Sequence, residues 1–239
     1  MTAPPPAGYD PHANQPVRAA GPPPESAAAT ILLMHGRGAT AESILTLHAE
    51  LKLPRVAALA PQAAGRTWYP ESFLAPLAAN QPYLDSALAR LAALVGDLLG
   101  RGIPSERIVL MGFSQGACLS LEFAARNPRR YGALLGLTGG LLGPPGTPRD
   151  YPGSFDGTPV FLGAGDPDPH VPFARVQETA SVLSRMQASV DLRRYPGLPH
   201  TINDDELEAC RDLVMRAAAG ASPPGPAGAQ GGRPPHDDA

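Results

Sequence analysis

Cysteine is scarce in this sequence of 239 residues, and neither of the two cysteines, Cys118 and Cys210, belongs to a Cys-x-x-Cys pair. Two cysteines do not make a disulfide framework, so an apolar core has to stabilise the fold. The chain also lacks a surplus of positive charge, because 19 lysines and arginines face 22 acidic residues and the formal charge is −3. This balance argues against nucleic acid as a partner.

Long apolar runs are absent as well. No stretch of about 20 apolar residues occurs, which is the length that a helix needs to cross a membrane. The first residues are alanines and prolines, in place of the charged and hydrophobic regions of a signal peptide. We therefore expect no stable membrane insertion and a soluble, cytoplasmic protein.

Apolar residues are abundant, at 43% of the chain, which is enough for one full hydrophobic core. Residues 1–9 and 219–239 are rich in proline, glycine and alanine and poor in large apolar side chains. Such segments bury too little surface to offset the entropy lost on ordering, so we expect disordered tails there. The sequence thus predicts a single domain over residues 10–218.

Apolar runs and helical periods alternate along this domain. Most of the runs are apolar without alternation, as strands covered on both faces should be; they span residues 29–36, 55–62, 107–114, 133–140, 159–166 and 190–197. Helical spacing marks residues 40–52, 84–101, 116–127, 172–187 and 203–218, with Thr40 and Asn203 as N-caps. We expect an α/β fold with a mostly parallel central sheet and helices on both faces, and an antiparallel edge strand within residues 15–21.

Ser114 stands in the pattern Gly-x-Ser-x-Gly, between an expected strand and an expected helix. A serine on such a sharp turn needs small neighbours, which Gly112 and Gly116 provide. The pattern also occurs by chance, and the alternative is a small residue in a tight turn. Because strand and helix are both present here, we favour the interpretation that Ser114 is an activated nucleophile.

A serine nucleophile requires a base and an acid that orients the base. His200 follows the last expected strand, in a loop that glycine and prolines keep out of helix, and is the best candidate for the base. His170 is the other histidine downstream of the serine within residues 10–218, and we interpret it as a solvated loop residue. The acid is Asp166 or Asp168, since both follow the strand at 159–164 and position alone does not separate them.

The loop "MHGRGAT" after the first parallel strand meets a further requirement of this chemistry. The tetrahedral intermediate carries an oxyanion that backbone amides must hold, and Arg37 and Gln115 are placed to supply them. Asp166, Asp168 and His170 at alternate positions also allow a metal site, but polar residues in a proline-rich loop favour turns. We therefore expect neither a metal nor a cofactor.

With these pieces placed, the sequence resembles the phospholipase/carboxylesterase family of α/β-hydrolases, which includes acyl-protein thioesterases and small bacterial carboxylesterases. The resemblance covers about residues 29–217 and rests on "HGRGA", "GFSQG", "GDPDPHVP" and "YPGLPH" in the family's order. It implies an α/β-hydrolase fold. The acid motif of the family, Asp-Pro-x-Val-Pro, matches residues 168–172, so the resemblance implies that Asp168 is the catalytic acid.

Two positions depart from the family pattern. Ala39 stands where the first loop usually has an aspartate, and Trp68-Tyr69-Pro70 stands where thioesterases of the family carry Trp-Phe-Asp. We expect Trp68, Tyr69 and Gly36 to contact substrate, with core aromatics as the alternative for the first two. No segment between the expected strands is long enough for a large lid domain, and residues 66–82 are expected to form at most a small cover.

The catalytic set of Ser114, Asp168 and His200, with an oxyanion hole at Arg37 and Gln115, predicts a serine hydrolase. Its substrate is expected to be a small-molecule or acyl ester, or a thioester, cleaved through an acyl-enzyme. The alternatives are an acyl-protein thioesterase or lysophospholipase, and a non-catalytic binding protein with a hydrolase fold.

Overall fold

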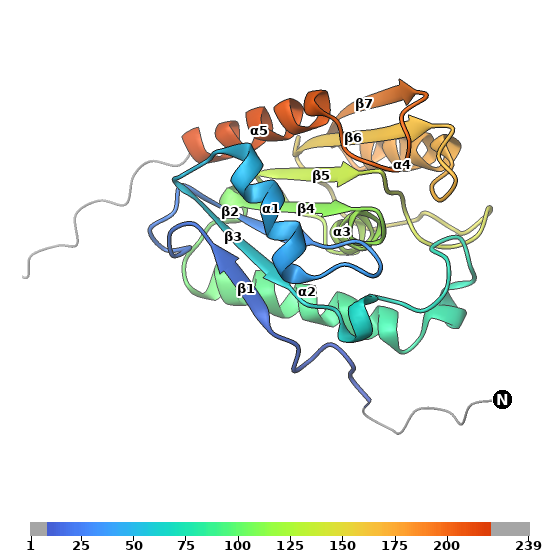
Figure 1. Cartoon of the computed structure of the whole chain (residues 1–239), viewed down its shortest axis with the longest axis horizontal. Coiled ribbons are helices and arrows are strands. Elements are labelled where there is room, and N and C mark those ends of the chain that lie inside the picture. Colours follow the sequence, from blue (N-terminus) through green and yellow to red (C-terminus); the bar gives the residue numbers. More distant parts are fainter. Residues whose placement is uncertain (1–8, 221–239) are drawn as a thin grey trace, which may run out of the picture.

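The computed structural model describes residues 9–220, which fold around one seven-stranded sheet (Figure 1). The strand order is β1-β3-β2-β4-β5-β6-β7, and only the edge pair β1 and β3 is antiparallel. All seven expected strands are confirmed, including the short edge strand. Their bounds are β1 Val17–Ala20, β2 Ala29–Met34, β3 Val56–Pro61, β4 Ile108–Phe113, β5 Ala133–Leu137, β6 Pro159–Asp166 and β7 Ser189–Pro196.

The helices lie on both faces of this sheet, as the alternation of strands and helices predicted (Figure 1). They are α1 Ala41–Leu51, α2 Tyr83–Gly100, α3 Gln115–Arg126, α4 Phe173–Arg185 and α5 Asp204–Ala219, with short 3-10 turns at Ala64–Arg66, Leu77–Asn80 and Ser105–Arg107. In the described part of the chain, no helix is both long and apolar enough to cross a membrane.

Two hydrophobic clusters fill the space between the sheet and these two helical layers. Successive residues of β2 alternate between them, so that Leu32 joins the cluster under α2, α3 and α4. Leu33 joins the cluster under α1 and α5. Every residue of β2 and β5 is buried, because helices cover both faces of these central strands. This explains why their sequences show no alternation of apolar and polar residues.

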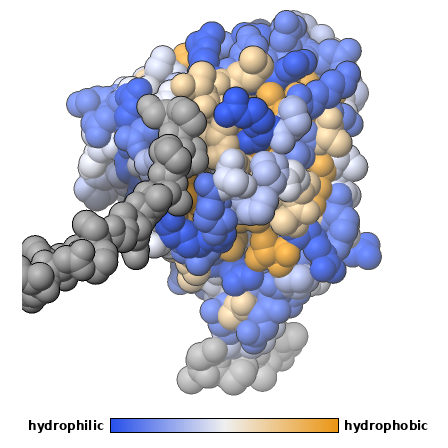
Figure 2. All heavy atoms as spheres, turned by 90° about the vertical axis from the view of Figure 1, so that its left-hand side faces the viewer, coloured by the Kyte–Doolittle hydropathy of each residue, from blue (hydrophilic) through white to orange (hydrophobic). Residues whose placement is uncertain are grey.

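The amino ends of the parallel strands form the face of the molecule that is turned away from the functional residues discussed below. Figure 2 shows this face as largely hydrophilic, with hydrophobic residues gathered near its middle. Leu53, Pro54 and Met215 line a small hollow of about 250 Å³, and Met215 is 49% exposed.

The expected tails fall mainly outside the described residues, which leaves 1–8 and 221–239 without a structural description. At the amino end, the hydroxyl of Tyr9 lies 3.2 Å from that of Tyr83. At the other end, α5 continues to Ala219, one residue beyond the expected limit of the domain at 218.

Both expected N-caps are confirmed, and each forms a reciprocal capping box. The side chain of Asn203 accepts a hydrogen bond from the Glu206 amide at 2.9 Å, and the Glu206 carboxyl accepts one from the Asn203 amide at 3.0 Å. The Glu206 side chain is completely buried, and its Oε1 has no hydrogen-bond partner. Burial raises the pKa of Glu206 to about 7.

Glu206→Gln should make the protein more stable relative to wild type as the pH rises. In the wild type the carboxyl titrates near 4.5 when unfolded but near 7 when folded, so stability is lost as the pH rises between these values. Glutamine keeps the capping bond and does not ionise. We expect its advantage in the free energy of unfolding to grow by about 2 kcal/mol from pH 5 to pH 8.

Urea unfolding at the two pH values measures this difference. Glu208→Gln is the matched control, because it removes an exposed carboxylate from the same helix. A Glu206→Gln difference that stays constant with pH would contradict the assignment.

Candidate active site

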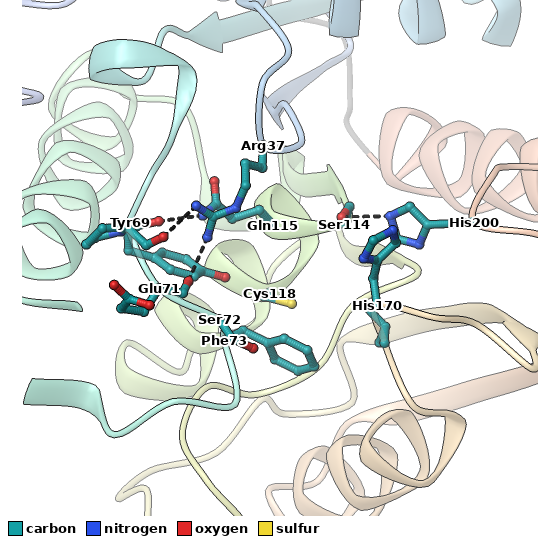
Figure 3. Close-up of a pocket in the computed structure, with 12 residues that line it drawn as sticks. Arg37, Tyr69, Glu71, Ser72, Phe73, Ser114, Gln115, Cys118, His170 and His200 are labelled. Carbon is teal, nitrogen blue, oxygen red and sulfur yellow. Dashed lines mark hydrogen bonds between the residues drawn. The ribbon is translucent and has the colours of Figure 1, made fainter. Parts of the chain in front are cut away.

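The carboxyl ends of β2, β4, β6 and β7 surround a pocket of about 460 Å³ (Figure 3). In an open parallel sheet, ligands gather at this edge because the loops that follow the strands meet there. The pocket is lined by Arg37, Tyr69, Pro70, Glu71, Ser72, Phe73, Ser114, Gln115, Cys118, His170, Val171 and His200. Four of these residues, Ser114, His200, Arg37 and Gln115, are among the sequence candidates for catalysis.

Ser114 occupies the sharp turn between β4 and α3, with φ 54° and ψ −119°. This backbone conformation is strained for a residue with a side chain, and such strain persists only where the surroundings enforce it. A Cβ at Gly112 would lie 2.4 Å from the carbonyl carbon of Gly116, and a Cβ at Gly116 would lie 2.2 Å from the carbonyl oxygen of Met34. The two glycines therefore allow α3 to start directly against the sheet.

His200 connects Ser114 to Asp168 through its two ring nitrogens. Its Nε2 lies 2.9 Å from Oγ of Ser114, and its Nδ1 lies 2.7 Å from Oδ2 of Asp168. The ring packs against Phe113, with a centroid distance of 5.1 Å. These contacts align a hydroxyl, an imidazole and a carboxylate, which is the arrangement of a nucleophile, its base and an orienting acid.

The two acid candidates have separate environments, although both follow β6. The side chain of Asp168 is fully buried, and its Oδ1 accepts hydrogen bonds from the amides of His170 and Val171 at 2.7 and 2.8 Å. Burial opposes its ionisation, but these bonds and the His200 contact together lower the pKa of Asp168. Asp166 instead forms an ion pair with Arg194 of β7. Only Asp168 contacts the histidine.

His170 is exposed, in keeping with its interpretation as a loop residue, and its ring meets that of His200 edge-on at 4.8 Å between centroids. The alternative metal set of Asp166, Asp168 and His170 is not assembled, since the first two carboxylates bind Arg194 and His200. Across residues 9–220, no group of three or more His, Cys, Asp or Glu residues is placed to hold a metal ion.

Gln115 and Arg37 both bind the backbone of the segment that covers the pocket. The Gln115 amide is the first in α3, so it has no partner within the helix. Its side chain accepts a hydrogen bond from the Trp68 amide at 3.0 Å and donates one to the Tyr69 carbonyl at 2.8 Å. The Arg37 guanidinium donates to the carbonyls of residues 70 and 71, both at 2.6 Å.

Sequence reasoning missed these side-chain bonds. A large amide directly after the nucleophile, in a turn of otherwise small residues, is the one local signal that points to them. Through these four contacts, residues 68–71 of the expected cover at 66–82 are tied to the nucleophile turn and to the loop after β2. The expected small cover is thus a fixed part of the pocket wall.

The three expected substrate contacts have different outcomes. Tyr69 lines the pocket. Trp68 is fully buried, does not line it, and donates from Nε1 to the His35 carbonyl at 2.8 Å. Its placement fits the alternative of a core aromatic, because its polar atom is satisfied inside the protein. Gly36 also lies outside the lining, and a Cβ there would be 3.6 Å from Cβ of Ser114.

The strand order, the strained serine turn after β4 and the histidine loop before the last helix define an α/β-hydrolase fold. The model of the phospholipase/carboxylesterase family matches residues 18–216. The chain belongs to this family. A crystal structure of a phospholipase/carboxylesterase from Dyadobacter fermentans is 46% identical, with a TM-score of 0.81, over 84% of this chain and 97% of that one.

Among curated relatives, acyl-protein thioesterase 1 of Yarrowia lipolytica is 26% identical over 198 residues, which are 75% of this chain and 87% of that protein. Acyl-protein thioesterase 1 of Gibberella zeae is 36% identical over 126 residues, 52% of this chain. That match spans about half of the relative, at 53% of its length.

Asp168→Asn should lower kcat/KM for a short ester by about 10³- to 10⁴-fold, because an amide does not hold the histidine in the required tautomer. Asp166→Asn removes only an ion pair with an exposed arginine and should cost less than about tenfold. Steady-state kinetics of both variants, with thermal unfolding as the control for folding, measure the difference. The opposite ranking would contradict the geometry.

Proposed function

We propose that this protein is a serine hydrolase that cleaves carboxylic esters or thioesters through an acyl-enzyme. The observation that carries the proposal is the continuous contact from Asp168 through His200 to Ser114, which ends at a pocket large enough for a small substrate. Membership in the phospholipase/carboxylesterase family supports the same reaction class.

In the first half of the proposed reaction, Oγ of Ser114 attacks the carbonyl carbon while Nε2 of His200 takes the hydroxyl proton. Asp168 stabilises the imidazolium, and its lowered pKa keeps it ionised for this task. The oxyanion accepts hydrogen bonds from the backbone amides of Gln115 and Arg37. Removal of one such donor typically costs about 3 to 4 kcal/mol of transition-state stabilisation.

Collapse of the intermediate breaks the bond to the leaving group, which takes the proton from His200 and departs as an alcohol or thiol. In the second half, His200 removes a proton from water, which attacks the acyl carbon. A second tetrahedral intermediate then collapses, the proton returns to Oγ of Ser114, and the carboxylic acid is released. No cofactor takes part in these steps.

We further propose that small esters, rather than protein thioesters, are the preferred substrates. As the family resemblance implies, thioesterases of the family carry an aspartate where this chain has Pro70. The first loop of the family also usually has an aspartate, where this chain has Ala39. Here the carbonyl of Pro70 accepts a hydrogen bond from Arg37, so the guanidinium at the pocket wall binds the backbone of the cover and no acidic side chain stands at position 70. The relatives named acyl-protein thioesterase 1 make thioesters the natural comparison.

A binding protein with a hydrolase fold is the remaining alternative. Such proteins typically lack a member of the catalytic set. All three members are present here, at hydrogen-bonding distances, which supports turnover over mere binding.

Ser114→Ala should abolish hydrolysis of p-nitrophenyl acetate and butyrate, with a loss of kcat of about 10⁴-fold or more, and should abolish labelling by a fluorophosphonate. The reason is that the nucleophilic oxygen is removed while the strained turn stays. Spectrophotometric assays and mass spectrometry of the labelled serine measure both effects.

The matched control is Ser120→Ala, on the same helix, where the hydroxyl only donates to the Gly116 carbonyl at 2.7 Å. This variant should keep both activities. Full activity of Ser114→Ala would overturn the proposal, and a wild type that neither labels nor hydrolyses would favour the binding-protein alternative.

A further inference from the structure

The inner end of the pocket lies along the first turn of α3. Cys118 lies four residues beyond Ser114, about 6 Å along the helix axis. Beside Cys118 the pocket is lined by the rings of Tyr69 and Phe73, which are 1% and 7% exposed, respectively. Figure 3 shows Phe73 beyond Cys118 as seen from Ser114, with His200 on the other side of the serine.

This placement separates the two halves of a substrate. His200 must protonate the leaving group, so that group lies on the histidine side of Ser114. The acyl chain then points away from His200, toward Cys118 and Phe73. The apolar surfaces of these two residues suit a hydrocarbon chain.

The segment that follows β5 closes the space behind Cys118 and Phe73. Residues 138–143 are all buried. The Gly143 amide donates to the Phe73 carbonyl at 2.7 Å, and the Gly140 amide lies 3.4 Å from Sγ of Cys118. A Cβ at Gly140 would lie 2.9 Å from Cγ of Arg175, so this segment packs tightly against α4.

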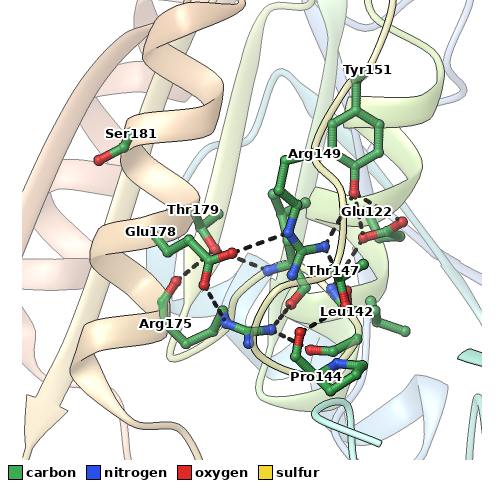
Figure 4. Close-up of polar contacts among 12 residues, drawn as sticks. Glu122, Leu142, Pro144, Thr147, Arg149, Tyr151, Arg175, Glu178, Thr179 and Ser181 are labelled. Carbon is green, nitrogen blue, oxygen red and sulfur yellow. Dashed lines mark hydrogen bonds and ion pairs between the residues drawn. The ribbon is translucent and has the colours of Figure 1, made fainter. Parts of the chain in front are cut away.

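Arg175 holds the closing segment from the α4 side (Figure 4). Its guanidinium is 5% exposed and donates to the carbonyls of Leu141 and Gly143 at 2.9 and 2.6 Å. It also pairs with Glu178 at 2.9 Å and lies 6.0 Å from the centre of the Phe73 ring. One buried cation therefore fixes both the segment and the aromatic ring that rests on it.

Further charged side chains hold Leu142, the residue between the two that Arg175 binds. Glu122, at 2% exposed, accepts a hydrogen bond from the Leu142 amide at 3.1 Å. Arg149 donates to the Leu142 carbonyl at 2.6 Å and pairs with Glu178 at 3.1 Å. We call Glu122, Arg149, Arg175 and Glu178 the Arg175 network. The side chains of Glu122, Arg149 and Arg175 are buried, whereas Glu178 is 39% exposed. The buried charges resist movement, because each lost partner leaves a charge without solvation.

We propose that Phe73 is a specificity-determining residue that closes the acyl end of the pocket, and that Arg175 is the positioning residue that holds it there. Cys118 lies about one helical turn from the nucleophile, and we infer that the closed end beside it and Phe73 takes a short acyl chain in preference to a long one. The substrate class is thus esters of short-chain acids. This inference rests on the proposed esterase function.

The chain-length profile of the wild type is the first test. We measure kcat/KM for p-nitrophenyl acetate, butyrate, octanoate and decanoate, and expect butyrate to exceed decanoate by at least about tenfold. A wild type that hydrolyses decanoate as well as butyrate overturns the chain-length limit and leaves the esterase proposal standing. One that hydrolyses none of the four esters overturns the esterase proposal as well.

Variants of Phe73 test its role directly. Phe73→Ala should raise the ratio of decanoate to butyrate kcat/KM by at least about tenfold, and the smaller change Phe73→Leu should raise it less. Loss of folded protein lowers both rates by one factor, so the ratio reports the pocket alone. Tyr83→Ala removes an aromatic ring that packs against Tyr9 outside the pocket and should leave the ratio unchanged.

Arg175→Met should also raise the ratio, and Arg175→Lys, which keeps the charge but not the fork of donors, should give an intermediate value. An unchanged ratio in Phe73→Ala, or in Phe73→Leu if the first variant does not fold, overturns the role of Phe73. An unchanged ratio in Arg175→Met with a raised ratio in the Phe73 variants overturns the role of Arg175.

Discussion

The close approach of α3 to β2 is the contact on which the whole site depends. A side chain at Gly116 would collide with the carbonyl oxygen of Met34, so only glycine lets the helix begin against the sheet. The chain then has to turn sharply at Ser114, which raises the hydroxyl above the strand ends. The same contact brings the loop after Met34 beside the first turn of α3. Arg37 and Gln115 therefore meet at the mouth of one pocket.

Gln115 links the reaction site to the wall of the pocket. Its backbone amide faces the position that we propose for the oxyanion, while its side chain holds the backbone of Trp68 and Tyr69. The side chain of Arg37 donates to the next two carbonyls, those of residues 70 and 71. Side-chain bonds to backbone carbonyls fix a cover without a lid domain, because they satisfy polar groups that a moving segment would expose. The cover is consequently positioned by the same two residues whose backbone amides we propose for the oxyanion hole.

Most of the fold could be predicted from the sequence, because the spacing of apolar residues and the residues that cap helices are local signals. Thr40 and Asn203 cap the expected helices, and Gly-x-Ser-x-Gly marks the turn. Asp166 and Asp168 could not be separated by position, since the register of β6 against β7, which brings Arg194 beside the former, has no local signal. Trp68 could not be assigned to the pocket or to the core for a similar reason: an aromatic side chain suits a pocket wall and a core equally well.

The two ends of the pocket are stabilised by different forces. Close packing of glycines under α3 fixes the nucleophile, and buried charges fix the segment behind Phe73. Charged residues on an amphipathic helix normally indicate a solvated face, so the sequence gives no sign that Arg175 is buried. Its partners at 141–143 also lie about thirty residues away in the sequence. The two sets of contacts share no residue, although Glu122 belongs to the helix that starts at the serine turn. The proposed chain-length selection at Phe73 therefore rests on other side chains than the proposed chemistry at Ser114.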